Sequence, residues 1–149
     1  MKKLRRIVTI GIFGLAVGLA AGGGGCSYLQ NRGATSWNMQ PNEKVPAAQG
    51  KVMVSKPDGA NRQVTVSVEH LAPPTQAFGK STYVVWIRPV GGGEAQNMGV
   101  LQFDDDLEAR LTFKTPFKTF DVVISAEEQP NVTSPSNDLA FQASVAVPA

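Results

Sequence analysis

The sequence predicts an all-β protein, an antiparallel β-sandwich of about seven short strands over residues 49–149. Three observations support this fold class. Apolar and polar residues alternate along successive short runs, turn-forming residues separate the runs, and no segment after residue 49 has the 3.6-residue period of a long amphipathic helix. Many short strands with frequent turns are typical of a sandwich.

The clearest alternation lies at 63–69, where Val64, Val66 and Val68 share one face and polar residues share the other. The same period of two predicts strands at 51–55, 107–113, 120–126 and 139–147, with Leu107 and Leu139 on the apolar parity. Turn signals separate the runs, at 57–59, 73–74, 91–93, 104–106, 116 and 134–137.

Two further runs depart from simple alternation. Residues 83–87 are apolar on both faces, which predicts a central strand that is covered on both sides. Within the run 98–103 the apolar positions change parity between Val100 and Leu101, which predicts a β-bulge or a strand that crosses between sheets.

The first 25 residues have the pattern of an export signal. Four basic residues among the first six precede the apolar run 7–21, and small residues follow it. A helix of that length spans only ~22 Å, short of a ~30 Å hydrocarbon core, so a transmembrane anchor is the less favoured alternative. Without this segment ten basic residues stand against twelve acidic ones. The basic pI therefore belongs to the leader and gives no evidence for nucleic-acid binding.

The only cysteine, Cys26, follows four glycines at the end of this leader. Residues 1–26 resemble a bacterial lipoprotein signal peptide: Gly25 and Cys26 match the end of its lipobox, and Gly23 stands where the family prefers leucine. The resemblance implies cleavage before Cys26 and acylation of its thiol. Ser27 would then favour the outer membrane if the host has two membranes. Several acyl chains, palmitate among them, hold a protein firmly on a bilayer.

Ordinary secretion with cleavage after Gly23 is the alternative, and it would leave Cys26 as an unpaired thiol in an oxidising compartment. Lipidation is favoured because it consumes that thiol. Residues 26–48 show no regular period and contain Gly33, Pro41 and Pro46, which predicts a flexible tether in front of the domain at 49–149.

Four runs of the predicted domain resemble the extracytoplasmic C-terminal domain of anti-sigma-K-type factors. They are VTVSVEHLAPP, YVVWIRP, NMGVLQF and FDVVISAEEQPNVTSPS. The matching positions are Leu71, Pro73, Pro74, Tyr83, Trp86, Gly99, Leu101, Ala126, Glu127, Pro135 and Ser136. The resemblance implies an immunoglobulin-like sandwich outside the cytoplasm. Since only six residues precede the apolar run, we expect no cytoplasmic sigma-binding domain and do not transfer the anti-sigma activity.

The sequence has no recognisable catalytic or metal site. A nucleophile needs a positioned base, and the only histidine, His70, is expected at a strand end, capped or partly exposed. A copper site of two histidines and a cysteine is excluded because the chain has a single histidine. The acidic run 104–106 lacks the EF-hand glycine and is interpreted as a solvated turn. We therefore expect no enzyme activity, no metal and no cofactor.

These features together indicate a non-catalytic, lipid-anchored cell-envelope protein that acts as a structural or protein-interaction module, with an envelope protein as its expected partner. The predicted contact loops are 72–80, 89–95 and 129–137, because binding residues concentrate on loops of rigid scaffolds. Pro73, Pro74 and Phe78 are the candidate contact residues, and Phe78 is either an exposed anchor or tucked into the edge of the core. One alternative is an extracytoplasmic sensor or regulatory domain, like the one it resembles. Another is a periplasmic carrier of a small ligand or metal.

Overall fold

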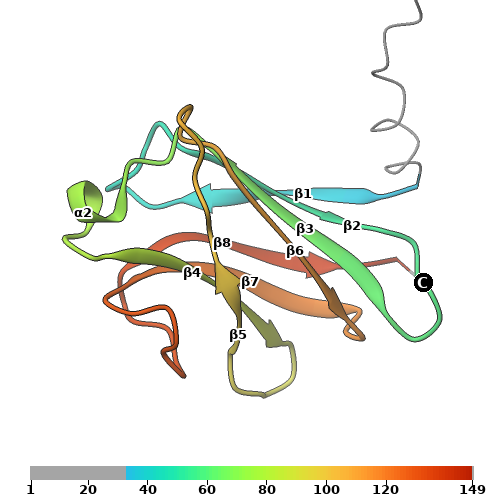
Figure 1. Cartoon of the computed structure of the whole chain (residues 1–149). Helices are drawn as coiled ribbons and strands as arrows, with labels where there is room; N and C mark the ends of the chain where they lie inside the picture. Colours follow the sequence, from blue (N-terminus) through green and yellow to red (C-terminus); the bar gives the residue numbers. More distant parts are fainter. Residues whose placement is uncertain (1–32, 149) are drawn as a thin grey trace, which may run out of the picture. The chain divides into compact units, whose positions relative to one another are not determined.

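The computed structural model describes residues 33–148, and this part of the chain is all-β, as predicted (Figure 1). Its strands are β1 Thr35–Pro41, β2 Gln49–Val54, β3 Arg62–Glu69, β4 Thr82–Pro89, β5 Gln96–Val100, β6 Ala109–Thr115, β7 Thr119–Glu127 and β8 Leu139–Ala146. A four-residue helix, α2 Pro74–Ala77, lies between β3 and β4. Every strand pairing is antiparallel.

The eight strands form one sheet in the order β5-β4-β7-β8-β1-β2-β3-β6, which is nearly closed as a barrel. The two end strands, β5 and β6, follow one another in the chain and share the connection at 101–108. An isolated antiparallel β-bridge pairs Phe103, shortly after β5, with Ala109 at the start of β6. Beyond it the barrel wall is left open between β5 and β6.

The sequence prediction is wrong for the second half of the tether. Residues Thr35–Pro41 form β1, which pairs with β2 along most of its length and with β8 at Gln40 and Pro41. This strand connects β2 to β8 and therefore belongs to the domain, which does not start at residue 49. It was missed because only Met39 of β1 is buried, so the strand has almost no alternation for a sequence pattern to reveal.

The seven predicted runs all contain a strand, and the turn signals all lie between strands. The predicted bulge is also present. The register between β4 and β5 shifts where Val85 pairs with Gly99 and Trp86 pairs with Asn97, which leaves Met98 as the extra residue. The shift places Met98 against the main core and Val100, two residues later, in the outer cluster, so the parity changes at Met98 and not between Val100 and Leu101 as predicted.

Two apolar residues do not take the core-facing positions that alternation predicts. Leu107 is 40% exposed and has a positive φ of 61° in the turn before β6. Leu139 faces away from the core, because the pairing of β7 with β8 slips so that Ile124 lies opposite Phe141 and Ser125 opposite Leu139. The slip turns Ala140 into the core instead.

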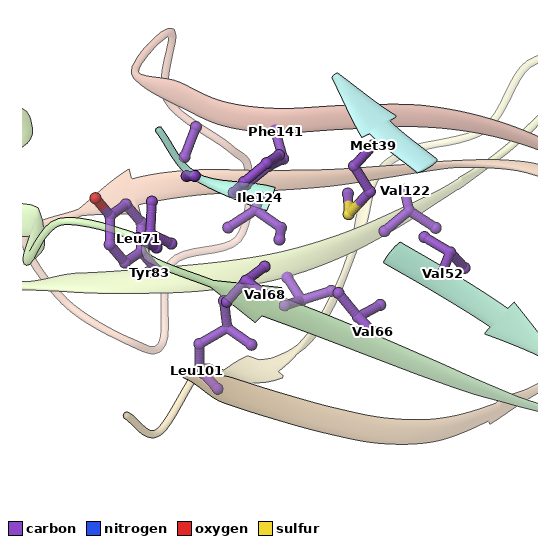
Figure 2. Close-up of a cluster of buried hydrophobic side chains, with 14 of the residues drawn as sticks. Met39, Val52, Val66, Val68, Leu71, Tyr83, Leu101, Val122, Ile124 and Phe141 are labelled. Carbon is purple, nitrogen blue, oxygen red and sulfur yellow. The ribbon is translucent and has the colours of Figure 1, made fainter. Parts of the chain in front are cut away.

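The core lies inside the nearly closed sheet and draws side chains from strands that are far apart in the sheet order (Figure 2). Val52, Val66 and Val68 come from β2 and β3. They share one cluster with Ile124 of β7 and Phe141 of β8. Such buried aliphatic and aromatic side chains contribute roughly 1.5–3 kcal/mol each to folding.

Strand β4 is covered on both faces, as predicted. Tyr83, Val85 and Ile87 point into the core, whereas Val84 and Trp86 belong to a second, smaller cluster on the outer face. All five side chains are nearly inaccessible to solvent. Strand β4 pairs with β5 on one side and β7 on the other, so it is not an edge strand.

The domain has two ends with different connections. At the end that we name the proximal end, β1 begins and β8 finishes: Thr35 pairs with Val54, and Thr119 pairs with Ala146. The opposite end carries the connections 42–48, 70–81, 101–108 and 128–138, which we name the tip loops. In Figure 1 the C-terminus lies at the right and α2, in the tip loop 70–81, at the left.

Candidate interaction surface

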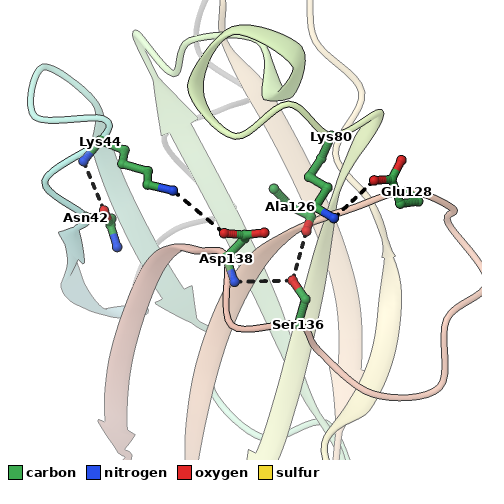
Figure 3. A network of polar contacts seen from close by, with 7 residues as sticks. All are labelled: Asn42, Lys44, Lys80, Ala126, Glu128, Ser136 and Asp138. Carbon is green, nitrogen blue, oxygen red and sulfur yellow. Dashed lines mark hydrogen bonds and ion pairs between the residues drawn. The ribbon is translucent and has the colours of Figure 1, made fainter.

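Three of the tip loops are tied to one another by polar contacts (Figure 3). The Lys80 ammonium lies 3.0 Å from a carboxylate oxygen of Glu128, which joins loop 70–81 to loop 128–138. The Lys44 ammonium lies 3.7 Å from a carboxylate oxygen of Asp138 and 5.0 Å from the centre of the Phe78 ring. The hydrogen bond to Glu128 and its negative charge raise the pKa of Lys80. These contacts make the three loops one surface.

The predicted contact residues Pro73, Pro74 and Phe78 all lie in tip loop 70–81. Pro73 directly precedes α2 and Pro74 begins it, and both are half-buried. The Phe78 ring packs against the core edge and meets Tyr83 edge-on, with 6.1 Å between ring centres. The structure therefore places the Phe78 ring in the tucked position at the edge of the core, where it is half-buried.

Tyr83 holds the same loop from the core side. Its hydroxyl donates a hydrogen bond of 2.8 Å to the carbonyl oxygen of Ala72, and its ring lies against Phe78 and, 5.9 Å away, Phe103. The side chain is 1% exposed, and this burial raises the pKa of the Tyr83 hydroxyl. Loop 70–81 is thus held to β4 by a residue that points into the core.

Loop 128–138 is held by a buried polar chain on the outer face of the sheet. The Trp86 indole N–H donates to the Ser125 hydroxyl (2.8 Å), and that hydroxyl donates to a carboxylate oxygen of Glu127 (2.5 Å). The same oxygen accepts the backbone N–H of Ser136 at 2.7 Å. Glu127 is only 5% exposed although it faces away from the core, because loop 128–138 folds back over it.

A second set of contacts holds the start of this loop. The side-chain amide of Asn97 on β5 donates to the carbonyl oxygens of Pro130 (2.9 Å) and Val132 (3.1 Å). Val132 packs with Trp86 in the outer apolar cluster. The loop therefore spans the outer face from β7 to β5 and carries its own small core.

Sequence reasoning missed this buried chain, although part of its signal was visible. Ser125 and Glu127 are two residues apart and therefore share a strand face, and Trp86 lies on the outer face of the neighbouring strand. Which segment would cover that face could not be read from the spacing.

The predicted contact loop 89–95 does not lie with the other two. It leaves β4 at the proximal end, where Pro89 pairs with Phe120 and the backbone N–H of Val90 bonds to Thr119. Val90 is 57% exposed, the largest exposure of a large apolar residue in the described chain. The structure thus brings 72–80 and 129–137 together at the tip and separates 89–95 from them.

A hollow of about 460 Å³ lies on the outer face beside loop 128–138. Its lining includes the exposed Arg88 and Gln142, Asp121, whose carboxylate accepts the Ser144 hydroxyl at 2.7 Å, and Ser136. Pockets that hold small molecules are usually apolar and enclose most of their ligand. This polar hollow is not such a pocket, so it gives the carrier alternative little support.

The remaining candidates for chemistry are dispersed. His70 is exposed just after β3, with a positive φ of 56°. Asp104 lies in the exposed acidic turn before β6, where its carboxylate accepts the backbone N–H groups of Asp106 and Glu108, both at 3.0 Å. Among residues 33–148 no three His, Cys, Asp or Glu side chains gather as metal ligands. Cys26 lies outside the described residues.

Within the same part of the chain, no helix is long and apolar enough to span a bilayer. No protein-family model matches this chain, and a search of curated proteins found no match.

Proposed function

We propose that this chain is a lipid-anchored, non-catalytic protein of the cell envelope whose domain presents the tip loops to an envelope protein partner. The anchor is acylated Cys26, and Ser27 favours the outer membrane in a host with two membranes. The proposal extends to the finer fold assignment, an immunoglobulin-like sandwich. Strands β2, β3 and β6 and strands β4, β5, β7 and β8 pack across one core, with β1 joining the two groups.

One observation carries the proposal: the chain enters the domain at the end opposite the tip loops. Residues 27–34 separate Cys26 from β1 and can reach at most about 28 Å at ~3.5 Å per residue. An anchor at Cys26 would keep the proximal end near the bilayer and direct the tip loops away from it. The hydrogen bonds of the buried Tyr83 to Ala72 and of the buried Glu127 to Ser136 hold loops 70–81 and 128–138 in place, which supports a preformed contact surface there.

The anchor is tested by metabolic labelling with a palmitate analogue in cells that express the full chain. We expect label on the wild-type protein and none on Cys26→Ala, because the thiol is the acceptor. The variant Ser27→Ala keeps the thiol and serves as the matched control for processing. Label that persists on Cys26→Ala would contradict the proposal.

The contact surface is tested with a photo-crosslinking amino acid placed at one of two exposed positions. Gln76 lies in α2 on tip loop 70–81, and Asp58 lies in the β2–β3 turn at the proximal end. We expect a discrete envelope-protein adduct from position 76 and none from position 58. Equal adducts from both positions, or an adduct from position 58 alone, would rule out the tip loops as the contact surface.

A further inference from the structure

The opening between β5 and β6 leaves one edge of β6 unpaired. Among the described residues β6 pairs only with β3, and β5 pairs only with β4. Figure 1 shows the two strands leaving their shared connection and then separating. An ideal Cβ on Gly99 of β5 would lie 3.5 Å from a methyl carbon of Leu111, so the Leu111 side chain reaches β5 across the opening although the two backbones are not paired there. The free edge of β6 is therefore residues 111–115, about 17 Å of strand.

The edge is apolar on its inner side. Leu111, Phe113 and Phe117 are only half-buried, although they pack against the main core, and Met98 of β5 is half-buried against the same core. An additional strand with apolar residues at every second position would cover these side chains and complete the barrel. Strand β5 is less suited as the acceptor, because it is short and carries the bulge at Met98.

Three basic residues lie on the outer side beside this edge, of which Arg110 also lines a hollow with Glu69, Asp104 and Glu108. Arg110 and Lys114 are exposed on β6, and Lys118 follows β6 in the turn before β7. None of the three is in an ion pair with another residue of the described chain. A strand beside β6 would place its outward side chains next to these cations, so acidic residues at alternate positions fit best.

The same charges disfavour a second copy of this chain as the occupant. Antiparallel pairing of two β6 strands centred on Thr112 sets Lys114 opposite the second copy's Arg110. Pairing centred on Phe113 sets the two lysines at diagonal positions on one face, and pairing centred on Lys114 sets them opposite each other. Like charges directly across a strand pair are destabilising, and charged edges are a common protection against self-pairing.

We propose that β6 accepts an extended segment of a protein partner, in which apolar and acidic residues alternate, as an added strand of the sheet. Backbone hydrogen bonds to residues 111–115 supply the affinity, and the apolar and acidic side chains of the segment supply specificity. This inference rests on the proposal that the domain acts by binding a protein, and it names a second contact surface apart from the tip loops.

The test uses the purified full chain and two labelled seven-residue peptides, one of alternating glutamate and valine and one of alternating lysine and valine. We expect the glutamate peptide to bind at least about tenfold more tightly by fluorescence anisotropy. The double variant Arg110→Glu/Lys114→Glu should reverse this preference. The matched control Lys51→Glu makes a charge reversal on the outer face of β2, away from the free edge, and should keep the preference.

Amide hydrogen exchange on the wild-type chain locates the bound peptide without any variant. Slower exchange of amides within 111–115 on adding the glutamate peptide supports strand addition. Absence of binding, unchanged exchange in 111–115, or self-association that already protects these amides overturns it. The labelling and cross-linking experiments on Cys26 and the tip loops do not involve β6, so they can succeed where this inference fails.

Discussion

Trp86 donates its indole N–H to the hydroxyl of Ser125 on the outer face of the sheet, at 2.8 Å, although neither residue is accessible to solvent. The single hydroxyl proton of Ser125 is then free to bind Glu127, so one serine joins a buried indole to a buried carboxylate. This relationship explains how loop 128–138 is held over a face that would otherwise be open.

The variant Ser125→Ala should destabilise the domain by about 1–3 kcal/mol, because it leaves the Trp86 N–H and one Glu127 interaction without a partner in a buried site. Urea unfolding followed by Trp86 fluorescence in a Trp37→Phe background measures the change. The control Ser144→Ala removes an exposed hydroxyl that bonds Asp121, and it should cost under about 0.5 kcal/mol. Equal effects of the two variants would contradict the role of the buried chain.

The variant Glu127→Ala should release loop 128–138, since the carboxylate accepts both the Ser125 hydroxyl and the Ser136 backbone N–H. We expect faster amide exchange throughout 128–138 and a loss of about 1–3 kcal/mol in the free energy of unfolding. Lys80→Ala breaks the exposed contact of the same loop with Glu128 and should barely change either measurement. A loop that opens in Lys80→Ala and stays closed in Glu127→Ala would reverse this assignment.

The variant Gly50→Ala should destabilise the domain by about 1–3 kcal/mol through overpacking. A Cβ on this residue would lie 3.0 Å from the Cβ of Met39 and 3.0 Å from a ring carbon of Phe141. These contacts come from β1 and β8, so the effect reports on the strand that links the two groups of strands. The neighbouring exposed change Gln49→Ala is the control, and thermal unfolding compares the two. A thermal unfolding midpoint that does not change in Gly50→Ala would argue against the observed position of β1.

The stability of the domain should fall above about pH 10, the ordinary range for tyrosine and lysine ionisation. Burial raises the pKa of Tyr83 and Glu128 raises that of Lys80, so both groups hold protons longer in the folded state. Their contribution to the free energy of unfolding is complete below the pKa that each group has in the unfolded chain. It is lost as the pH rises towards the higher pKa of the folded state. Urea unfolding at pH 8 and pH 10.5 measures this loss.

The variant Tyr83→Phe isolates the tyrosine part of the alkaline effect. At pH 8 it should cost about 1 kcal/mol, because the hydrogen bond to Ala72 is lost. At pH 10.5 the difference from wild type should shrink, since phenylalanine has no hydroxyl to ionise. In a Tyr28→Phe background the tyrosinate absorbance belongs to Tyr83 alone. A normal titration midpoint there would contradict the effect of burial.

The strands predicted from alternation were found where half of a strand is buried and half is solvated. Val64, Val66 and Val68 of β3 illustrate this, since they are buried whereas Gln63 and Glu69 of the same strand are exposed. The bulge in β5 was also predictable, because an extra residue necessarily changes the parity of the apolar positions. These features depend on neighbours in the sequence and on one buried face.

Strand β1 illustrates the opposite case. Only Trp37 and Met39 of its side chains contact the core, and its place in the sheet depends on backbone pairing with β2 and β8. Backbone hydrogen bonds are the same for every residue except proline, so a strand held mainly by pairing has little signature in the sequence. The orientation of Leu139 was mispredicted for a related reason: the slip at Ala140 arises from pairing with β7.

The sequence by itself determined that residues after 49 form short strands with turns between them. The reason is that alternating apolar and polar residues set which side of each strand is buried. It also predicted the leader with Cys26, on which the structure has no bearing. Only the tertiary structure decided that β1 completes the domain, that Glu127 lies under loop 128–138, and that the tip loops stand opposite the point where the chain enters. These arrangements depend on contacts between residues that are distant in the chain, and the spacing of residues within one segment does not predict such contacts.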